Sequence, residues 1–354
     1  MKRTAVVLAA LILLAPAWTL IPFFTTPGIG AASDGPVFSR DYTSYALDMQ
    51  AGPSQPDQVS YILNGYSITN GGSSVLVFDR LGVQGFQGSG TPVDSETMVR
   101  YADSALDFRL HNTPTAAIEI ALAAGGKVYV DMAGGMSALK SGSGVIVGGN
   151  NVSGVIVVSG SGVFSVANDF VIVQLAPASK MVFRATPPGE AQVSEGILSS
   201  RISGEMYVSS TPGKVLQGGI AYGGAGMEAL LTSNNSFSAS VNGSIGGKVM
   251  VINLDRGMMP DIDSRKIAVS VSGADAQKSE NAAAIVWETG GEAKYFVSID
   301  GEILQILVYV PADTGTGVIS ISEHVDQGPG LDTVMSAIAA TLVVVVAAAA
   351  LYKR

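Results

Sequence analysis

Three aspartates lie close together in the second half of the chain, at Asp255, Asp261 and Asp263. Carboxylate oxygens on a loop are the hard ligands that Ca²⁺ binds, so these residues are the candidate metal ligands. The segment lacks the spaced Asp/Asn pattern and the closing Glu of a helix-loop-helix calcium site. Neighbouring cations, including Arg256 and Arg265, can neutralise the same charges. A solvated, ion-paired turn is therefore favoured over a metal site.

Acidic residues can also catalyse hydrolysis. If the protein is a hydrolase, the candidate catalytic carboxylates are Glu190, Asp255 and Asp261. Such a site needs two carboxyl groups about 5 to 10 Å apart across a cleft. Ser137 and Lys140 have the Ser-x-x-Lys spacing of acyl-serine enzymes. Neither of the companion motifs, Ser-Asp-Asn and Lys-Thr-Gly, follows them, so chance spacing is favoured.

The composition excludes several other kinds of functional site. The chain of 354 residues has no cysteine and two histidines, which excludes disulfides, thiolate metal sites and a cysteine nucleophile. The glycine-rich run at 218–226 does not open a strand-turn-helix unit, so it lacks the context of a nucleotide site. We therefore predict no cofactor. A net charge of −9 excludes a basic surface for nucleic acid.

Three Asn-x-Ser sequons begin at Asn151, Asn234 and Asn242. Each lies in a segment rich in turn-forming residues, and on an exported chain such a segment is a glycosylation acceptor. Chance occurrence is an equally supported interpretation, because Asn and Ser are both common in loops. The sequence thus predicts glycosylation at these three asparagines, with chance occurrence as the alternative.

The N-terminus has the pattern of an export signal. Lys2 and Arg3 precede an uncharged, apolar run that ends in small residues. This order predicts a signal peptide over residues 1–32. An uncleaved anchor helix over residues 5–24 is the alternative.

The C-terminus has the pattern of a membrane span. Thr333–Tyr352 is 20 residues long and carries no charge. As a helix it covers about 30 Å, the thickness of the hydrocarbon core. Lys353 and Arg354 follow it, and basic residues favour the cytoplasmic side. The sequence thus predicts contact with the lipid bilayer, a two-residue cytoplasmic tail and an extracytoplasmic position for the bulk of the chain.

The segment before this span carries one resemblance to a known group of proteins. Gly328, Pro329 and Gly330 precede the apolar span and its basic end. This order resembles the tripartite C-terminal tail of archaeal surface proteins, in which a Pro-Gly-Phe signal comes first. The chain has Leu331 at the place of that Phe. The resemblance covers only this short tail and implies a prokaryotic surface protein. We predict that residues 326–332 form the linker before the span.

Between the ends, the hydrophobic pattern has the period of β-strands. Leu106–Leu110 and Ala117–Leu122 alternate, which places Asp107, Arg109 and Glu119 on the face opposite the apolar side chains. Between residues 125 and 184, runs rich in Val and Ile recur, separated by Gly, Ser and Asn. The pattern predicts an all-β region of sandwich or meander type, with a solenoid as the lesser option. The continuous runs predict strands covered on both faces, or on one face plus a neighbouring sheet.

Pro187, Pro188 and Gly189 interrupt this pattern, because a central strand does not accommodate them. We predict one β-domain over residues 33–185 and another over residues 190–325, or one continuous double sheet.

Two local features complete the expected architecture. Asp300 and Gly301 lie between apolar runs and predict a hairpin turn. Outside the two ends, the helix candidate is residues 94–101, which begin with an acidic residue.

Taken together, the sequence predicts a membrane-anchored cell-surface protein with a structural or adhesive role. A non-catalytic role is favoured over an enzyme, and neighbouring surface proteins or glycans are the expected partners. The first alternative is an anchored module that binds a ligand or glycan. The second is a surface hydrolase. The structural role rests on analogy with other β-sandwich proteins, because a fold alone does not specify a function.

Overall fold

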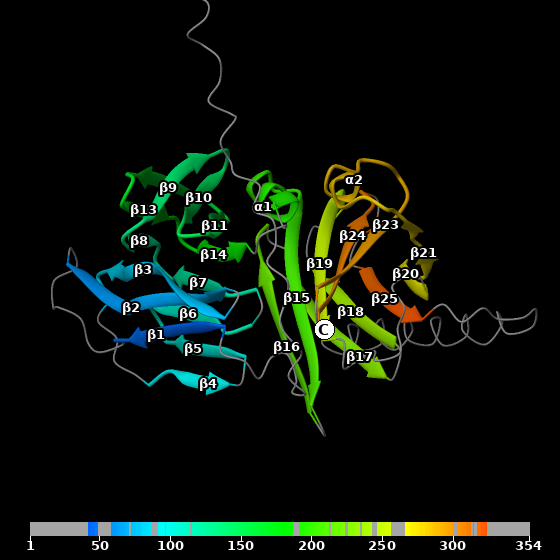
Figure 1. Ribbon diagram of the computed structural model, residues 1–354, viewed down its shortest axis with the longest axis horizontal. Helices are drawn as coiled ribbons and strands as arrows, with labels where there is room; N and C mark the ends of the chain where they lie inside the picture. The colour runs from blue at the N-terminus through cyan, green and yellow to red at the C-terminus, as the bar shows by residue number, and fades with distance from the viewer. Residues whose placement is uncertain are drawn as a thin grey trace, which may run out of the picture. The chain divides into compact units, whose positions relative to one another are not determined.

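The computed structural model describes residues 42–48, 58–70, 72–86, 91–95, 97–113, 115–186, 191–211, 214–223, 226–233, 236–242, 246–255, 266–300, 303–312, 314 and 317–323. Nearly all the secondary structure in these residues is β-strand, and the strands form four sheets of mostly antiparallel pairs (Figure 1). The prediction of an all-β region is therefore confirmed.

Two sheets contain only strands that end at or before Thr186, and together they form the first sandwich. Sheet A has six antiparallel strands, in the spatial order β1 (Thr43–Leu47), β2 (Val59–Asn70), β3 (Ser73–Gln84), β8 (Gly126–Met132), β13 (Phe170–Leu175) and β12 (Gly162–Val166). Sheet B has eight antiparallel strands, in the order β4 (Val93–Ser95), β5 (Met98–Ala102), β6 (Leu106–His111), β7 (Ala117–Leu122), β14 (Lys180–Thr186), β11 (Val152–Ser159), β10 (Gly144–Gly149) and β9 (Met136–Ser141).

The core of the first sandwich lies between the inner faces of sheets A and B. Alternation along the strands sends one side chain in two into this space. At its centre Phe78 of β3 meets Phe183 of β14 edge to face, with ring centroids 4.7 Å apart, and Tyr66 of β2 stacks on Phe78. All three side chains are fully buried, so the two sheets are held by apolar contact.

The second sandwich uses residues from Ile202 onward. Sheet C has six strands, in the order β16 (Lys214–Ala221), β15 (Ile202–Thr211), β19 (Lys248–Asp255), β24 (Ile303–Val310), β23 (Lys294–Asp300) and β22 (Gln277–Lys278). Sheet D has five strands, in the order β17 (Gly226–Ser233), β18 (Ser236–Asn242), β25 (Gly317–Glu323), β20 (Ile267–Val271) and β21 (Ala274–Asp275). The pairs β15–β19 and β22–β23 are parallel.

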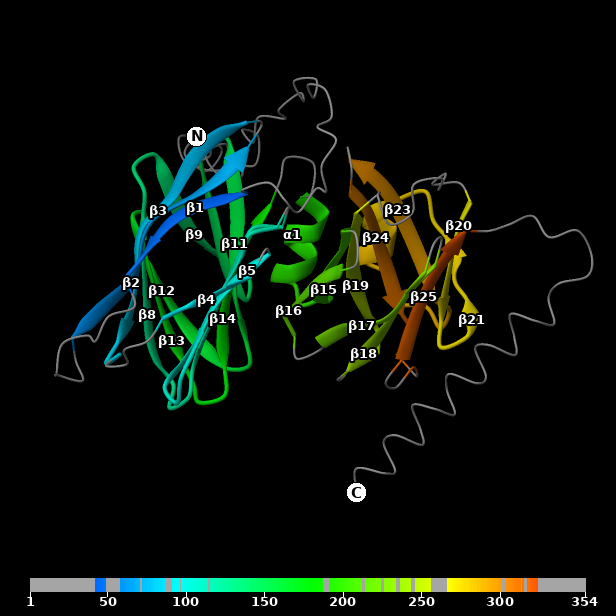
Figure 2. The same cartoon turned by 90° about the horizontal axis from the view of Figure 1, so that it is seen from below.

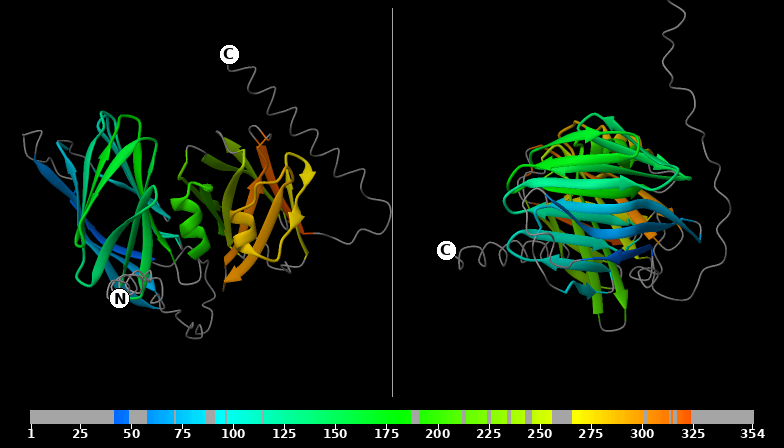
Figure 3. Two further views of the ribbon diagram at one scale, coloured as in Figure 1. Left: turned by 90° about the horizontal axis from the view of Figure 1, so that it is seen from above. Right: turned by 90° about the vertical axis from the view of Figure 1, so that its left-hand side faces the viewer.

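A third apolar cluster joins the two sandwiches. Two helices contribute to it, α1 (Ala191–Leu198) and α2 (Ala282–Val286). Val155 and Val182 of sheet B and Leu307 of sheet C pack in the same cluster. Helix α1 lies between the strands of the two sandwiches (Figure 2, Figure 3). The outer faces of β11 and β14 are thus covered, as predicted. The prediction is wrong for β10 and β12, where Ile146 and Val163 are 37% and 65% exposed.

The helix predicted over residues 94–101 is wrong. The segment forms β4 and β5, and Ser95 pairs with Met98 across a tight turn. The reason is the alternation after Met98: Val99 and Tyr101 are buried, while Arg100 points outward. In a strand, alternate side chains point the same way, so the apolar residues of this segment all face the core. In a helix, about half of them would point away from the core.

Both helices of the described residues were missed by the sequence interpretation. Helix α1 begins directly after the interrupted segment at 187–190. Helix α2 is capped by Asn281, whose side-chain oxygen accepts hydrogen bonds from the backbone N–H groups of Ala283 and Ala284. By contrast, the predicted hairpin is confirmed, because Asp300 of β23 pairs with Ile303 of β24.

In the part of the chain that the structure describes, no helix has the length and apolar character needed to cross a bilayer. The predicted signal peptide or anchor, the linker, Thr333–Tyr352 and the basic tail all lie outside the described residues. The described residues all belong to one compact unit, although the sheets change from A and B to C and D across residues 187–201. The division into two β-domains stays a prediction.

Candidate functional site

Charged and polar side chains gather on the outer face of sheet B, which faces the second sandwich. Residues paired across neighbouring strands share one face of a sheet. Arg109 of β6 lies opposite both Arg100 of β5 and Glu119 of β7. His111 lies further along β6, and Lys180 and Arg184 lie on β14. This arrangement confirms that Asp107, Arg109 and Glu119 share a face, as the alternation predicted.

At the buried end of this face, Arg184 pairs with Glu205 of β15. The guanidinium donates from Nε to Oε2 at 2.6 Å and from Nη2 to Oε1 at 3.0 Å, and the two side chains are 1% and 0% exposed. Tyr222, Asn253 and Thr115 donate further hydrogen bonds to the same carboxylate, at 2.7, 2.6 and 3.1 Å. The bonds from Arg184 and Thr115 therefore link the first sandwich to the second.

These donors decide the charge of Glu205. Burial by itself raises the pKa of this carboxyl group, but the positive charge of Arg184 and the hydrogen bonds from Arg184, Tyr222 and Asn253 outweigh it, so the pKa is lowered. The carboxylate stays ionised, and donors surround both of its oxygens. A group in this state has no lone pair available for a substrate proton.

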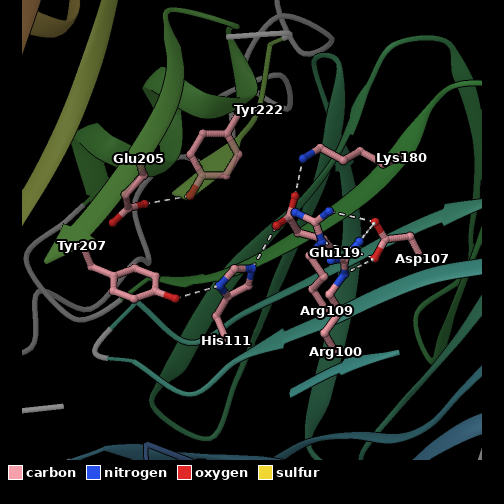
Figure 4. Close-up of polar contacts among 9 residues, drawn as sticks. All are labelled: Arg100, Asp107, Arg109, His111, Glu119, Lys180, Glu205, Tyr207 and Tyr222. Atoms are coloured by element: carbon pink, nitrogen blue, oxygen red, sulfur yellow. Dashed lines mark hydrogen bonds and ion pairs between the residues drawn. The ribbon is translucent and has the colours of Figure 1, made fainter. Parts of the chain in front are cut away.

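A second set of polar contacts crosses the same junction. His111 places Nε2 2.9 Å from Oε1 of Glu119 and Nδ1 3.2 Å from the hydroxyl of Tyr207 on β15 (Figure 4). Lys180 donates to the other oxygen of Glu119. Burial raises the pKa of Glu119, yet the bonds and charges of His111 and Lys180 overcome this effect and hold it at about 2. Burial also raises the pKa of Tyr207 to about 12.

The face becomes accessible to solvent at β5 and β6. Arg100 and Arg109 both donate to Asp107, through contacts of 2.8 to 3.3 Å. Burial by itself raises the pKa of Asp107, but the hydrogen bonds from Arg109 and Arg100 lower it below its usual value. The polar network thus runs from a fully buried ion pair to half-exposed guanidinium groups.

The predicted metal ligands do not form a site in the described residues. Asp255 ends β19, is buried, and accepts a hydrogen bond of 2.6 Å from Ser209. Asp261, Asp263 and Glu190 lie outside the described residues. Within the ranges that the structure describes, no three His, Asp or Glu side chains could together hold a metal ion.

Of the three predicted sequons, one lies in a hairpin turn, one lies at the end of a strand and one lies outside the described residues. Asn151 is exposed in the turn between β10 and β11, with a φ of 63°. Asn242 ends β18, where it pairs with Gly226, and its side chain is outside the described set. Asn234 is not among the described residues. Glycosylation at all three stays a prediction.

The Ser-x-x-Lys motif lies on β9, an edge strand of sheet B. Ser137 and Lys140 are three residues apart on an extended strand, so their side chains leave from opposite faces. An acyl-serine site needs the lysine to face the serine, which a helix provides at this spacing. The interpretation of the motif as chance spacing agrees with this geometry.

Sequence reasoning missed the residues at the centre of the network, among them His111, Arg184 and Glu205. A signal for two of them was present. Arg184 interrupts a run in which its neighbours Met181, Val182 and Phe183 are apolar, and Glu205 lies in a similar β-like segment. An isolated charge inside a strand that is buried on both faces requires a partner of opposite charge.

No protein-family model matches the chain, and no curated protein matches it in sequence. Among solved structures, the chain is similar to a mutant form of a glycoside hydrolase family 81 protein from Clostridium thermocellum, with 8% identity and a TM-score of 0.39. The match covers 82% of this chain and 35% of that protein. The chain therefore spans about a third of the length of the protein that it matches.

Proposed function

We propose that this protein is a membrane-anchored cell-surface protein with a structural, non-catalytic role. In this proposal Thr333–Tyr352 crosses the bilayer, Lys353 and Arg354 remain in the cytoplasm, and the β-sandwiches lie outside the cell. Residues 1–32 direct export.

The observation that supports the non-catalytic part is that the buried carboxylates Glu119 and Glu205 are occupied by hydrogen bonds and ion pairs. Catalytic acids and bases lie in a cleft that substrate can enter, where they keep a free proton or lone pair. Glu119 and Glu205 are 3% and 0% exposed, and each is held by hydrogen bonds and an opposite charge. Buried charges that connect two packed bodies support a rigid structural unit.

The anchor rests on the sequence of the C-terminus. An uncharged segment of 20 residues followed by two basic residues meets the length and charge requirements of a spanning helix. A surface location also agrees with the acidic composition, because a net charge of −9 favours solubility and disfavours docking on anionic lipid.

Fractionation of cells that express the full chain tests the anchor. We expect the protein to stay in the membrane pellet after carbonate extraction and to be digested by protease added to intact cells. A matched chain that ends at Asp332 should be released into the medium. Recovery of the full chain in the carbonate supernatant would contradict the proposal.

The non-catalytic role has a separate test. Purified full-length protein in detergent is incubated with a panel of polysaccharides, and reducing ends are measured. We expect no release above the buffer control. Release that disappears in Glu119→Gln or Glu205→Gln variants of unchanged fold would replace this proposal with the hydrolase alternative.

A further inference from the structure

The first sandwich has an edge strand that lacks the usual protection against pairing with another chain. Strand β12 ends sheet A and pairs with β13 alone among the described strands. We propose that β12 pairs antiparallel with β12 of a second copy of this chain, so that the two copies of sheet A become one continuous sheet. The inference rests on the proposed structural role and deepens it, because it names a partner for that role.

The other sheet edges show what β12 lacks. An exposed edge is a template for another strand, and proteins protect such edges with short strands, charges or bulges. Among the described edge strands, β4 has three residues, and β21 and β22 have two each. Strands β1 and β17 are bulged where they pair with their neighbours. Strands β9 and β16 carry Lys140 and Lys214.

Strand β12 has none of these devices. Its five residues, Gly162–Val166, include no charge and no proline. Its register with β13 has no shift. Val163 is 65% exposed on the outer face of the sheet, whereas Phe164 is half-buried and packs against the core. The strand is therefore a regular, apolar edge that is open to pairing.

The ladder between β12 and β13 determines which backbone groups reach the free edge. The N–H of Ala167 donates to the C=O of Phe170, and the N–H of Ala176 donates to the C=O of Ser161, both at 2.9 Å. Residues bonded to the neighbouring strand alternate along an antiparallel pair, so the odd-numbered residues of β12 face β13. The even-numbered residues present their N–H and C=O groups to the free edge: these are Gly162, Phe164 and Val166. Within the described residues, no backbone group bonds to them there.

A second copy of the chain satisfies this edge because the strand is its own antiparallel partner. With a two-fold axis through Phe164, this residue faces its counterpart, and Gly162 faces Val166 of the second copy. Each donor on the edge then meets an acceptor. On the outer face, Val163 lies beside Ser165 of the second copy. Because each copy has one such edge among its described strands, the assembly closes at two copies.

The distribution of charge favours the same partner. In a chain with a net charge of −9, neither β12 nor β13 has a charged residue, so two copies meet less repulsion there than elsewhere. Asp169 lies in the turn beyond one end of β12. Lys127 lies near the other end, opposite Gln174, which itself pairs with Val163. Antiparallel pairing places the Asp169 end of each copy beside the Lys127 end of the other, and these charges attract.

The contact is small, which sets the expected strength. Five residues on each side form a smaller contact than the standard stable interface of about 1,600 Å². We therefore expect a dissociation constant of about 1 to 100 µM for the dimer in solution. Copies anchored in one membrane have a higher effective concentration, so pairing is more complete there.

Sedimentation of the purified full chain in detergent, over concentrations that span this range, tests the pairing. We expect the mass to change from one copy to two as the concentration rises. Val163→Lys should raise the dissociation constant at least tenfold, because it places two like charges close together across the two-fold axis. Val93→Lys is the matched control, because Val93 is 70% exposed on the edge strand β4.

Thermal melts check that both variants are folded. A wild type that stays monomeric throughout would overturn the proposal. Growth beyond two copies, or an equal loss in Val93→Lys, would also overturn it.

Disulfide cross-linking tests the register in the membrane. The chain has no cysteine, so each introduced thiol is unique. Val163→Cys and Ser165→Cys are expressed together in differently tagged chains. In the proposed pair their Cα atoms are about 4.5 Å apart, which a disulfide can bridge. Val163→Cys alone should cross-link poorly, because its counterpart lies beyond about 7 Å. Equal yields from the single variant and the mixture would overturn the antiparallel arrangement.

Failure of this inference can be separated from failure of the proposed function. A monomeric protein that resists carbonate extraction contradicts the pairing alone, and a dimeric protein in the carbonate supernatant contradicts the anchor alone. Hydrogen exchange at the amide of Phe164 identifies a different occupant of the edge. Protection of this amide in a monomeric sample would show that another part of the same chain covers β12, which would overturn the pairing.

Discussion

At the scale of single residues, the molecule depends on an ion pair that is costly to bury. Arg184 and Glu205 have almost no contact with solvent, so both charges lose their hydration on folding. Tyr222, Asn253 and Thr115 supply hydrogen bonds that offset this loss. A buried ion pair adds little to the stability of the fold compared with apolar residues of the same size. Any packing that separates the two charges, however, leaves each of them buried and unpaired, which is strongly unfavourable. We interpret the pair as a determinant of how the two sandwiches dock.

Removing one member of this pair should be severely destabilising. Arg184→Met leaves Glu205 buried without its countercharge, and we expect a loss of about 3 to 5 kcal/mol in the free energy of unfolding measured with urea. The double variant Arg184→Met with Glu205→Leu should recover much of that loss. Arg80→Met removes an exposed pair with Asp131 and should cost less than about 1 kcal/mol. A double variant as unstable as the single one would contradict this interpretation.

Glu119 predicts a pH dependence. Its pKa is lowered from 4.5 to about 2 in the folded protein, so the folded state favours the ionised form. The resulting stability is present above pH 4.5 and is lost as the pH falls toward 2. It amounts to on the order of 3 kcal/mol.

Urea unfolding between pH 7 and pH 2.5 checks this prediction with two variants. Glu119→Gln should be less stable than the wild type at pH 7, and the difference should shrink as the solution is acidified. Glu195→Gln, at an exposed position of α1, is the matched control and should follow the wild type. A difference for Glu119→Gln that stays constant down to pH 2.5 would contradict the linkage to its carboxylate.

At the scale of elements, the short helix α1 is part of the contact between the two sandwiches, although it has only eight residues. It packs Val193, Ile197 and Leu198 into the apolar cluster that both sandwiches share. Its other face is exposed, with Gln192 and Glu195. The helix therefore contributes to the junction, and its apolar face serves two sheets at once.

Ile197→Ala should lower the free energy of unfolding by about 2 to 4 kcal/mol, because it leaves a cavity in a fully packed cluster. Gln192→Ala on the exposed face of the same helix should change it by less than about 0.5 kcal/mol. Chemical denaturation of the two variants beside the wild type checks this. Equal effects would mean that α1 contributes through its own helicity rather than through packing.

At the scale of the whole molecule, the shared apolar cluster and the polar network act together. The cluster includes side chains from sheets B and C and from both helices, and the network adds Arg184–Glu205 and His111–Tyr207. Unfolding either sandwich alone would expose all of these groups on the other. The two sandwiches should therefore lose their structure together.

Calorimetry of the full chain should then show one transition, with equal calorimetric and van't Hoff enthalpies. Ile197→Ala should move this transition to lower temperature without splitting it. Two separate transitions in the wild type would instead mean that residues 33–185 and 190–325 are independent domains, and that the junction contributes little to stability.

The sequence by itself determined the local conformation and much of the burial. Alternation at Leu106–Leu110 and Ala117–Leu122 is enough to specify strands with one apolar face, since neighbouring side chains on a strand point to opposite sides. The unbroken run Val155–Val158 likewise indicated cover on both faces. Local pattern gave the wrong element at residues 94–101. The acidic residues at its start resemble the N-terminus of a helix, but the segment forms two strands.

The tertiary structure alone decided which faces meet and which charges become partners. His111 and Tyr207 are 96 positions apart, and Arg184 pairs with Glu205 in another sheet. The sequence shows that these side chains are polar and lie on strands, but alternation extends over a few residues and carries no information about distant strands. Which side chains become partners depends on the strand order of two sheets and on how the outer faces of these sheets pack. Both are determined only when the whole chain has folded.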